Sequence, residues 1–164
     1  MAPRAGGAPR PGAGSARNLL LLALVVGAPS LAGAACAIEP DENGHVFIPS
    51  SYTTIADYAF QSCGSLVSVK MSDSVTSIGA RAFQTCSSLT SFVVGSSVTS
   101  IATYAFESCR KLETVLFSNT PVALAAYAFA RCYLLTDLVI DATTIGDDAF
   151  AYCKKLTRVI IGDA

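Results

Sequence analysis

The sequence predicts an α/β repeat solenoid, in which parallel strands alternate with short helical turns. An Ala-Phe pair recurs five times, and its phenylalanines are separated by 23, 23, 23 and 21 residues. A short segment that alternates apolar and polar residues follows each pair. One coil of this length cannot bury its own apolar face, whereas stacked coils form a continuous core.

The first residues have the pattern of a secretory signal peptide, which we expect to span residues 1–37. An acid-free basic region precedes the apolar run "LLLLALVVGA" at 19–28, and small residues follow Pro29. The basic residues are Arg4, Arg10 and Arg17. This order of regions is typical of export signals, and cleavage is expected after Ala34 or Ala37. The sequence therefore predicts a secreted or cell-surface protein.

Two other interpretations of this segment stay open. Residues 19–38 carry no charge, and a spanning helix needs roughly 20 apolar residues, so an uncleaved anchor would place the chain in a membrane. Pro29 and Gly33 argue against that anchor. The third interpretation is a lipid-modified Cys36, and Gly33 weakens it because an aliphatic residue is expected three positions before such a cysteine.

The charge balance excludes one class of partner. Loss of the leader leaves eight basic and twelve acidic residues, which gives a net charge of −4. Nucleic-acid binders need a basic face that neutralises phosphates. We therefore expect no nucleic-acid partner.

A lead-in at 38–45 connects the leader to the repeats, which we place at 46–164. Its "DENG" sequence is typical of a turn. The following "HVFIP" places Val46 and Ile48 in register with the later repeats, so it predicts an extra strand. We expect six short strands and about five full repeats.

Four positions of each repeat form complete columns. The aromatic column is Phe60, Phe83, Phe106, Phe129 and Phe150. The cysteine column lies three residues later, at Cys63, Cys86, Cys109, Cys132 and Cys153. The leucine column follows after three more residues, at Leu66, Leu89, Leu112, Leu135 and Leu156. The fourth column precedes each phenylalanine by five residues, at Ile55, Ile78, Ile101, Leu124 and Ile145. We interpret all four as stacked core positions.

The segments after the leucines predict the strands. In "LTSFVV", Phe92 and Val94 share one parity, as one face of a strand requires, and the other segments match. The same parity turns an apolar side chain outward in four consecutive coils. These residues are Val93, Leu116, Val139 and Ile160. Segments such as "YAFESC" space their apolar residues like one helical face over two turns at most, so they predict the helical turns.

The pattern "SVTSIxxxAFxxCxxLTS" resembles the BspA-type leucine-rich repeat over about residues 45–161. The resemblance implies parallel strands on a concave side, the "AFxxC" segments on the other side, and a surface or secreted protein. Two departures predict local irregularity. Pro121 and Val122 replace the Ser-Val of earlier repeats, and the last repeat is two residues short between Ile140 and Ile145.

The cysteines suggest either a disulfide framework or buried thiols. Neighbouring cysteines of a parallel ladder would keep their Cβ atoms about 4.8 Å apart, which exceeds the roughly 3.5–4.5 Å of a disulfide. We therefore expect all five ladder cysteines to be free. Cys36, outside the ladder, is the candidate for reactivity or intermolecular pairing. Metal binding is not expected, because the single histidine, His45, lies outside the ladder.

No catalytic motif is recognisable, so we predict neither an enzyme nor a cofactor. Asp147 and Asp148 are adjacent acids, which we interpret as favouring a helix N-terminus. Basic residues gather after the later cysteines, and we interpret them as a solvated rim on the turns before the strands. These residues are Arg110, Lys111, Arg131, Lys154 and Lys155.

The outward apolar row predicts a binding surface, because the sheets of solenoids commonly recognise partners. The leading hypothesis is a non-catalytic recognition module that binds a protein or glycan, as in adhesion. The alternative is a structural role, either end-to-end self-association or one part of a longer array. It is based on the sequence "RVIIGDA", which provides no polar cap for the last coil.

Overall fold

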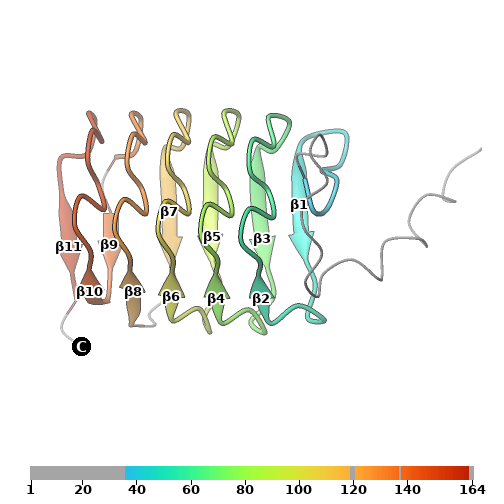
Figure 1. The fold of residues 1–164 in the computed structure, drawn as a ribbon, viewed down its shortest axis with the longest axis horizontal. Coiled ribbons are helices and arrows are strands. Elements are labelled where there is room, and N and C mark those ends of the chain that lie inside the picture. Colours follow the sequence, from blue (N-terminus) through green and yellow to red (C-terminus); the bar gives the residue numbers. More distant parts are fainter. Residues whose placement is uncertain (1–35, 119–120, 137, 163–164) are drawn as a thin grey trace, which may run out of the picture.

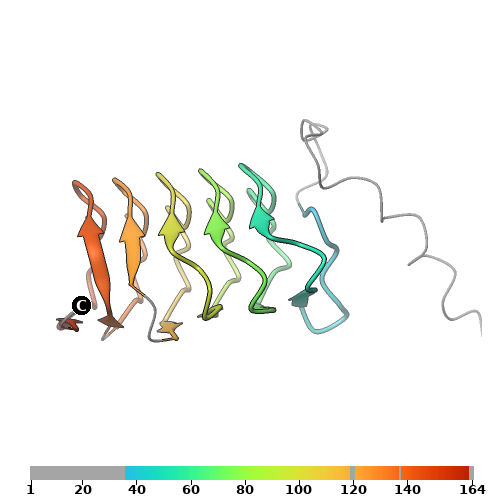
Figure 2. The ribbon, with the colours of Figure 1, turned by 90° about the horizontal axis from the view of Figure 1, so that it is seen from below.

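The computed structural model describes residues 36–118, 121–136 and 138–162. The chain forms a stack of coils, which Figures 1 and 2 show from two directions at right angles. Long strands line one side of the stack and shorter strands line another side. All strand pairs are parallel. The repeat solenoid predicted from the sequence is thus present. The proposed signal peptide falls almost entirely outside the described residues.

The strands fall into two sets. The long-strand side contains β1 (His45–Ile48), β3 (Ser68–Met71), β5 (Ser91–Val94), β7 (Thr114–Phe117), β9 (Leu138–Ile140) and β11 (Val159–Ile161). The short-strand side contains β2 (Thr54–Ile55), β4 (Ser77–Ile78), β6 (Ser100–Ile101), β8 (Val122–Leu124) and β10 (Ala142–Ile145). The first set comprises the six expected strands, and the second set was not expected.

The alternation of the long strands determines which side chains are buried. In β5, Phe92 and Val94 are buried while Val93 is exposed, and β3 shows the same alternation. Val69 pairs with Phe92, which pairs with Val115, so residues in corresponding positions of successive repeats meet. The register therefore converts each sequence column into a physical column.

The prediction of helical turns is wrong, because the structure has no helix within the described residues. Each "AFxxC" segment is a series of tight turns, and two non-glycine residues per repeat adopt positive φ, four positions apart. These residues are Tyr58 and Ser62, Arg81 and Thr85, Tyr104 and Ser108, Tyr127 and Arg131, and Asp148 and Tyr152. A left-handed residue interrupts the continuous right-handed backbone that an α-helix needs. The same finding removes the helix N-terminus assigned to Asp147 and Asp148.

The turn segments bond to the next coil instead of forming helices. The N–H of Cys63 donates to the carbonyl of Phe60 within the same coil at 3.0 Å. The N–H of Phe60 donates to Ala82 of the next coil at 2.7 Å, and Phe83 does the same to Ala105 at 2.8 Å. A left-handed non-glycine residue costs roughly 1–2 kcal/mol, and a hydrogen bond returns about 1 kcal/mol. Bonding between coils therefore offsets much of the backbone strain.

Stacked phenylalanines form the centre of the core. The ring centroids of Phe83 and Phe106 lie 5.1 Å apart with an interplanar angle of 8°, and Phe106 and Phe129 lie 4.9 Å apart. Phe92 of β5 meets the rings of Phe83 and Phe106 edge-on at 5.0 and 4.7 Å. This edge-to-face contact joins the long-strand side to the turn segments.

The departures in the last two repeats have local effects. β10 pairs with β8 through an irregular register, because the pairing shifts between Ala142 and Thr144. The shortened connection from Ile140 to Ile145 allows a bulge here and leaves the coil stack intact. The last coil is also less covered, since Phe150, Cys153 and Leu156 are only partly buried. No helical segment in the described ranges has the length and apolarity to cross a bilayer.

Candidate functional site

Exposed apolar side chains form a row along the long-strand side. We call this row of Phe47, Val93, Leu116, Val139 and Ile160 the apolar row. Their exposed fractions are 58%, 40%, 61%, 62% and 41%, respectively. Each residue occupies the third position of its strand, or the second in the shorter β9 and β11. The row therefore consists of large apolar groups that the core does not use.

Strand register brings the members of the row together. Val93 pairs with Leu116, and Val139 pairs with Ile160. Phe47 pairs instead with Lys70, so a cation separates the aromatic end of the row from its aliphatic part. Since paired strands lie about 4.8 Å apart, Val93 lies beside Leu116 and Val139 lies beside Ile160. The two pairs belong to different sheets, because β9 and β11 form a sheet separate from that of β1, β3, β5 and β7.

A polar border accompanies the apolar row at the first position of the strands. Ser68, Ser91 and Thr114 provide hydroxyl groups, and they pair with one another across β3, β5 and β7. The side chain of His45 continues the border, because its Nδ1 lies 2.7 Å from the Ser68 hydroxyl. Asp137, which the strand parity also turns outward, lies outside the described residues. An apolar row beside hydrogen-bonding groups has the composition of a recognition surface.

Phe47 was missed by the sequence interpretation, although a signal for it was present. Val46 and Ile48 were assigned to the core as an extra rung, and this assignment places Phe47 on the opposite face. Its exposed ring enlarges the row beyond the four predicted residues. The assignment of Val93, Leu116, Val139 and Ile160 to binding stays a prediction.

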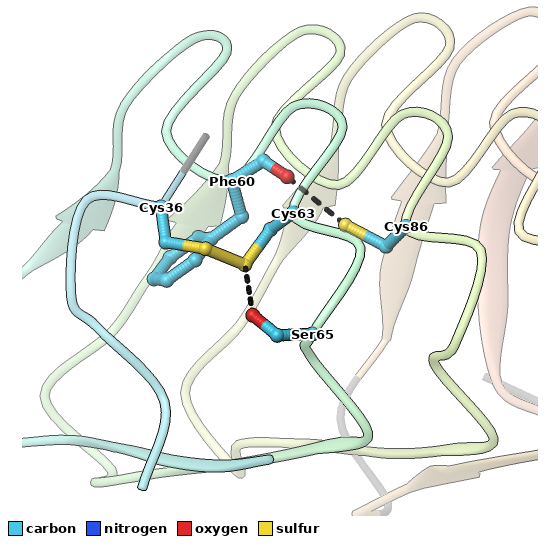
Figure 3. The surroundings of a disulfide bond; sticks show 5 residues. All are labelled: Cys36, Phe60, Cys63, Ser65 and Cys86. Atoms are coloured by element: carbon cyan, nitrogen blue, oxygen red, sulfur yellow. Dashed lines mark hydrogen bonds between the residues drawn. A yellow bond between two sulfur atoms is a disulfide. The ribbon is translucent and has the colours of Figure 1, made fainter. Parts of the chain in front are cut away.

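The first cysteine of the column, Cys63, is not free as expected. Cys63 forms a disulfide with Cys36, and their Cα atoms lie 5.3 Å apart (Figure 3). The expectation that all five ladder cysteines are free is therefore wrong for Cys63. The expected intermolecular pairing of Cys36 is also replaced by a bond within the chain. The distance between parallel Cβ atoms excludes a disulfide only between neighbouring cysteines of the column. Cys36 lies before the repeats and can therefore approach Cys63 from a different direction.

The other ladder cysteines are free and act as hydrogen-bond donors. The thiol of Cys86 donates to the carbonyl of Phe60 at 3.0 Å, and that of Cys109 donates to Phe83 at 3.0 Å. Burial raises the pKa of Cys109 well above its usual value, and burial raises the pKa of Cys153 to about 11. These two thiols therefore stay protonated at neutral pH and keep the proton that the hydrogen bond requires.

The acidic candidates have structural contacts. Asp148 accepts a hydrogen bond from the Tyr127 hydroxyl, and this bond raises the pKa of Tyr127 above its usual value. In the lead-in, Asp41 accepts the N–H groups of Asn43 and His45 at 2.9 and 2.8 Å. Gly44 adopts a φ of +83°, so "DENG" forms the expected turn. Within the described residues, no group of three potential ligands is positioned for a metal ion.

The family comparison matches residues 42–163 to the BspA type leucine rich repeat region, in six copies. The comparison with curated proteins found no match. The six copies correspond in number to the six long strands of the structure.

Solved structures of leucine-rich repeat proteins are similar to this chain. The T. pallidum Leucine Rich Repeat protein has a TM-score of 0.69 at 30% identity, covering 71% of this chain and 58% of its own. A leucine rich cell surface protein of Faecalibacterium prausnitzii A2-165 has a TM-score of 0.69 at 31% identity, with 77% and 34% coverage. A leucine-rich repeat protein of Bacteroides ovatus ATCC 8483 has a TM-score of 0.66 at 30% identity, with 71% and 33% coverage. The chain thus spans about a third to three fifths of these proteins' lengths.

Proposed function

Because the chain belongs to the BspA-type leucine-rich repeat family, we propose that it is a non-catalytic recognition module which binds a protein through its apolar row. The observation that carries this proposal is the exposure of apolar side chains on four consecutive long strands, at Val93, Leu116, Val139 and Ile160, with Phe47 beyond Lys70. Isolated exposed apolar residues are common on proteins, whereas a continuous patch is typical of an interaction surface. The module would contribute a rigid surface for recognition or adhesion.

The energetics favour a partner with a complementary apolar surface. Complete burial of one large aliphatic or aromatic side chain stabilises a complex by about 1.5–3 kcal/mol relative to leaving it exposed. Leu116 and Val139 lie near the middle of the aliphatic part and are the most exposed, so they have the most area left to bury. The hydroxyl groups of Ser91 and Thr114 lie close enough to add polar contacts at the border. We expect Leu116 and Val139 to contribute most to affinity.

The disulfide supports a secreted or cell-surface location. Disulfides persist in oxidising compartments and are rare in the reducing cytosol. Cleavage after Ala34 would keep Cys36 in the exported chain, whereas cleavage after Ala37 would remove it, so the Cys36–Cys63 bond requires the first of these sites. With that cleavage, the leader and the bond indicate the same compartment. The similar F. prausnitzii protein is described as a cell surface protein. We propose that this chain is exported and acts outside the cytosol.

The proposal is tested by changing the row without changing the core. The triple variant Val93→Lys, Leu116→Lys and Val139→Lys places hydrated charges in the apolar row. We expect far-UV circular dichroism and the melting temperature to stay nearly unchanged, while attachment to the cells or matrix that the wild type binds is lost. The matched control is Thr54→Lys, Thr76→Lys and Thr99→Lys, which adds the same charge at exposed positions on the short-strand side.

Two outcomes would contradict the proposal. A folded row variant that attaches as well as wild type would place the binding surface elsewhere. Loss of attachment in both triple variants would assign the effect to added positive charge instead of the apolar row. A photo-crosslinker at Leu116 should capture the partner, whereas one at Thr99 should not.

End-to-end assembly is the second candidate function. Ile145 and Ile161 are exposed on the last coil, and Phe150 and Leu156 are only partly covered. A second copy would bury these groups, and so would further coils of a longer array. Light scattering after size-exclusion chromatography separates the possibilities: growth in mass with concentration supports assembly, and a constant monomer mass contradicts it.

A further inference from the structure

The turns that join the "AFxxC" segments to the long strands change character along the stack. In the first two coils, the positions after the cysteines are Gly64, Ser65, Ser87 and Ser88. In the later coils, these positions carry four cations, and a fifth, Arg131, directly precedes Cys132. We call Arg110, Lys111, Arg131, Lys154 and Lys155 the basic rim. All five are exposed, and they lie in the segments that precede the long strands, outside the strands that carry the apolar row.

An aromatic ring positions two members of the basic rim. Arg110, Tyr133 and Lys154 follow the cysteines of three successive coils, so they occupy one column. The Arg110 guanidinium carbon lies 6.0 Å from the centroid of the Tyr133 ring, and the Lys154 Nζ lies 5.2 Å from it. These cation–π contacts restrict the long side chains without neutralising their charge. Both cations are therefore held in place and stay available to an anion.

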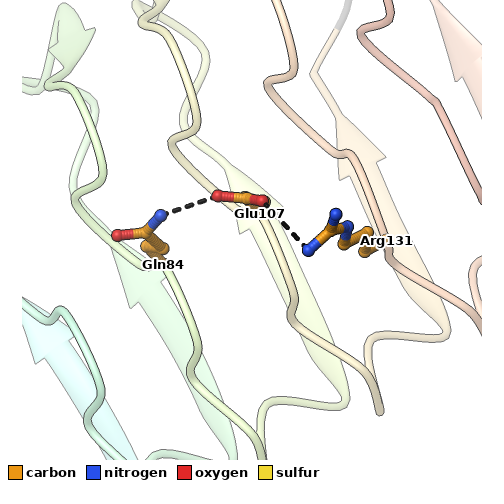
Figure 4. A network of polar contacts seen from close by, with 3 residues as sticks. All are labelled: Gln84, Glu107 and Arg131. Atoms are coloured by element: carbon orange, nitrogen blue, oxygen red, sulfur yellow. Dashed lines mark hydrogen bonds and ion pairs between the residues drawn. The ribbon is translucent and has the colours of Figure 1, made fainter.

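Carboxylates compensate little of this charge. The one ion pair found within the described residues joins Arg131 to Glu107, and its N–O distance of 3.9 Å is long (Figure 4). Glu107 also accepts a shorter hydrogen bond of 2.7 Å from Gln84. In the described part of the chain, Arg110, Lys111, Lys154 and Lys155 have no carboxylate within ion-pair distance. Glu113, two residues after Lys111, is an exposed acid at the edge of this region. The rim therefore concentrates positive charge on a protein that is acidic overall.

We propose that the basic rim is a second binding site and that its ligand is an acidic polysaccharide carrying carboxylate or sulfate groups. The rim spans three coils, or about 10 Å at the spacing of adjacent strands, so several charges can contact one linear polyanion. Lys154 and Lys155 are consecutive, which provides two cations on one coil. Repeated weak ion pairs of this kind give binding that depends on chain length and salt concentration.

The aromatic groups and the backbone favour a polysaccharide over an acidic peptide. Tyr152 is 69% exposed, and the Arg131 guanidinium carbon lies 5.9 Å from the centroid of its ring. An exposed aromatic ring beside a cation offers a stacking surface for a sugar ring and a charge for its acidic substituent. The backbone N–H of Arg131 donates to Ala151 at 2.7 Å, so it is not available to pair with a peptide strand.

The test measures the binding of the full chain to heparin as a sulfated probe, polygalacturonate as a carboxylated probe, and poly-glutamate as an acidic peptide. The rim variant is Arg110→Gln, Lys154→Gln and Lys155→Gln. The control variant is Ser62→Glu, Thr85→Glu and Ser87→Glu, which changes net charge by the same amount on the turns of the first two coils. All altered positions are exposed, so both variants should retain the wild-type melting temperature.

We expect the wild type to bind at least one polysaccharide at low salt and to release it as salt rises. The rim variant should bind it about tenfold more weakly, and the control variant should lose about twofold or less. Arg4, Arg10 and Arg17 are unchanged in every variant, so unchanged affinity of the rim variant would assign binding to other cations and overturn the proposal. Failure of the wild type to bind either polysaccharide would also overturn it.

Binding of poly-glutamate tests whether the basic rim binds acidic peptides instead of polysaccharides. If it binds more tightly than both polysaccharides at equal charge, the rim is an acidic-peptide site and the proposal is wrong. The apolar row provides an independent check, because the rim variant should retain the attachment that the row mediates. Loss of both functions in the folded rim variant would contradict a separate second site.

Discussion

The first and the last repeats have the same sequence pattern but differ in burial. Phe60, Cys63 and Leu66 are buried, whereas Phe150, Cys153 and Leu156 are only partly covered. The difference comes from their neighbours. The segment just before the repeats bonds to the first repeat, since the N–H of Ala37 donates to the carbonyl of Ala59 at 2.7 Å. A repeat of this protein is therefore stabilised chiefly by the coils on either side, as expected for a nearly one-dimensional array.

The lead-in closes the first repeat by reproducing contacts that a preceding coil would make. Between successive coils, the N–H of each Phe, such as Phe60 or Phe83, donates to an alanine carbonyl of the next coil. The carbonyl of the same Phe accepts a hydrogen bond from the cysteine thiol of that next coil. At the first coil, Ala37 supplies the N–H donor. Cys36 occupies the partner position of Cys63 through the disulfide. Among the described residues, Cys36, Ala37 and Ile38 pack against the core at this end.

Removal of a central phenylalanine should have the largest effect. Phe106→Ala should cost about 3–5 kcal/mol of unfolding free energy, because two stacked rings and the edge of Phe92 lose their contact. Phe150→Ala should cost less than about 2 kcal/mol, since Phe150 is only partly buried and its ring stacks on Phe129 from one side. Urea melts measure both values, and equal costs would contradict the dependence on neighbours.

Removal of the disulfide should come next. Cys36→Ser should cost about 2–4 kcal/mol, because the bond closes a loop with a sequence separation of 27. Reductant should destabilise the wild type by the same amount and leave the variant unchanged. Thiol titration in denaturant without reductant should detect four cysteines, and detection of six would refute the bond.

High pH should destabilise the folded protein, and the partly buried thiol of Cys153 should contribute to the loss. The folded-state pKa of Cys153 is raised to about 11, so the folded protein holds a proton that the unfolded chain releases near pH 9. The contribution of this thiol to stability is therefore constant below about pH 9 and is lost as pH rises toward 11. Cys153→Ala should flatten the alkaline decline in thermal melts, and an unchanged decline would exclude this thiol as its cause.

The exposed polar contacts of the turn segments should contribute least. Gln84 donates to Glu107 at 2.7 Å, so Gln84→Ala should cost about 1 kcal/mol. Arg131→Ala should cost less than about 0.5 kcal/mol, because its ion pair with Glu107 is long and the Arg131 side chain is 54% exposed. Their double variant in urea melts distinguishes a coupled chain of contacts from independent pairs, and a larger loss for Arg131 than for Gln84 would contradict this order.

The columns and the strand parity could be predicted from the sequence, because both depend on periodic spacing. The turns could not, since a spacing of three residues from Phe106 to Cys109 suits a helix and a series of tight turns equally. The positive φ of Tyr104 and Ser108 has no sequence signal of the kind that glycine provides. The short strands were missed because pairs such as Thr54–Ile55 are too short to show alternation.

Two parts of the candidate sites needed three-dimensional contacts. The disulfide depends on where the lead-in places Cys36, which lies 27 residues before Cys63 and has no place in the repeat. Arg110, Tyr133 and Lys154 share one column of the sequence, but the distances that define their cation–π contacts required the structure. Spacing along the chain identifies columns, whereas contacts between different columns depend on the direction of each turn.

The register of 23 residues also allows the length of this protein to change by whole units. Ser68 pairs with Ser91, which pairs with Thr114, so deletion of one complete repeat would bring equivalent residues into the same pairing. Each added or removed coil would change the reach of the protein by about 4.8 Å. A change by part of a repeat has to be absorbed in a connection, as the bulge between Ala142 and Thr144 shows. Reach can thus vary in fixed steps while the strand pairing is preserved.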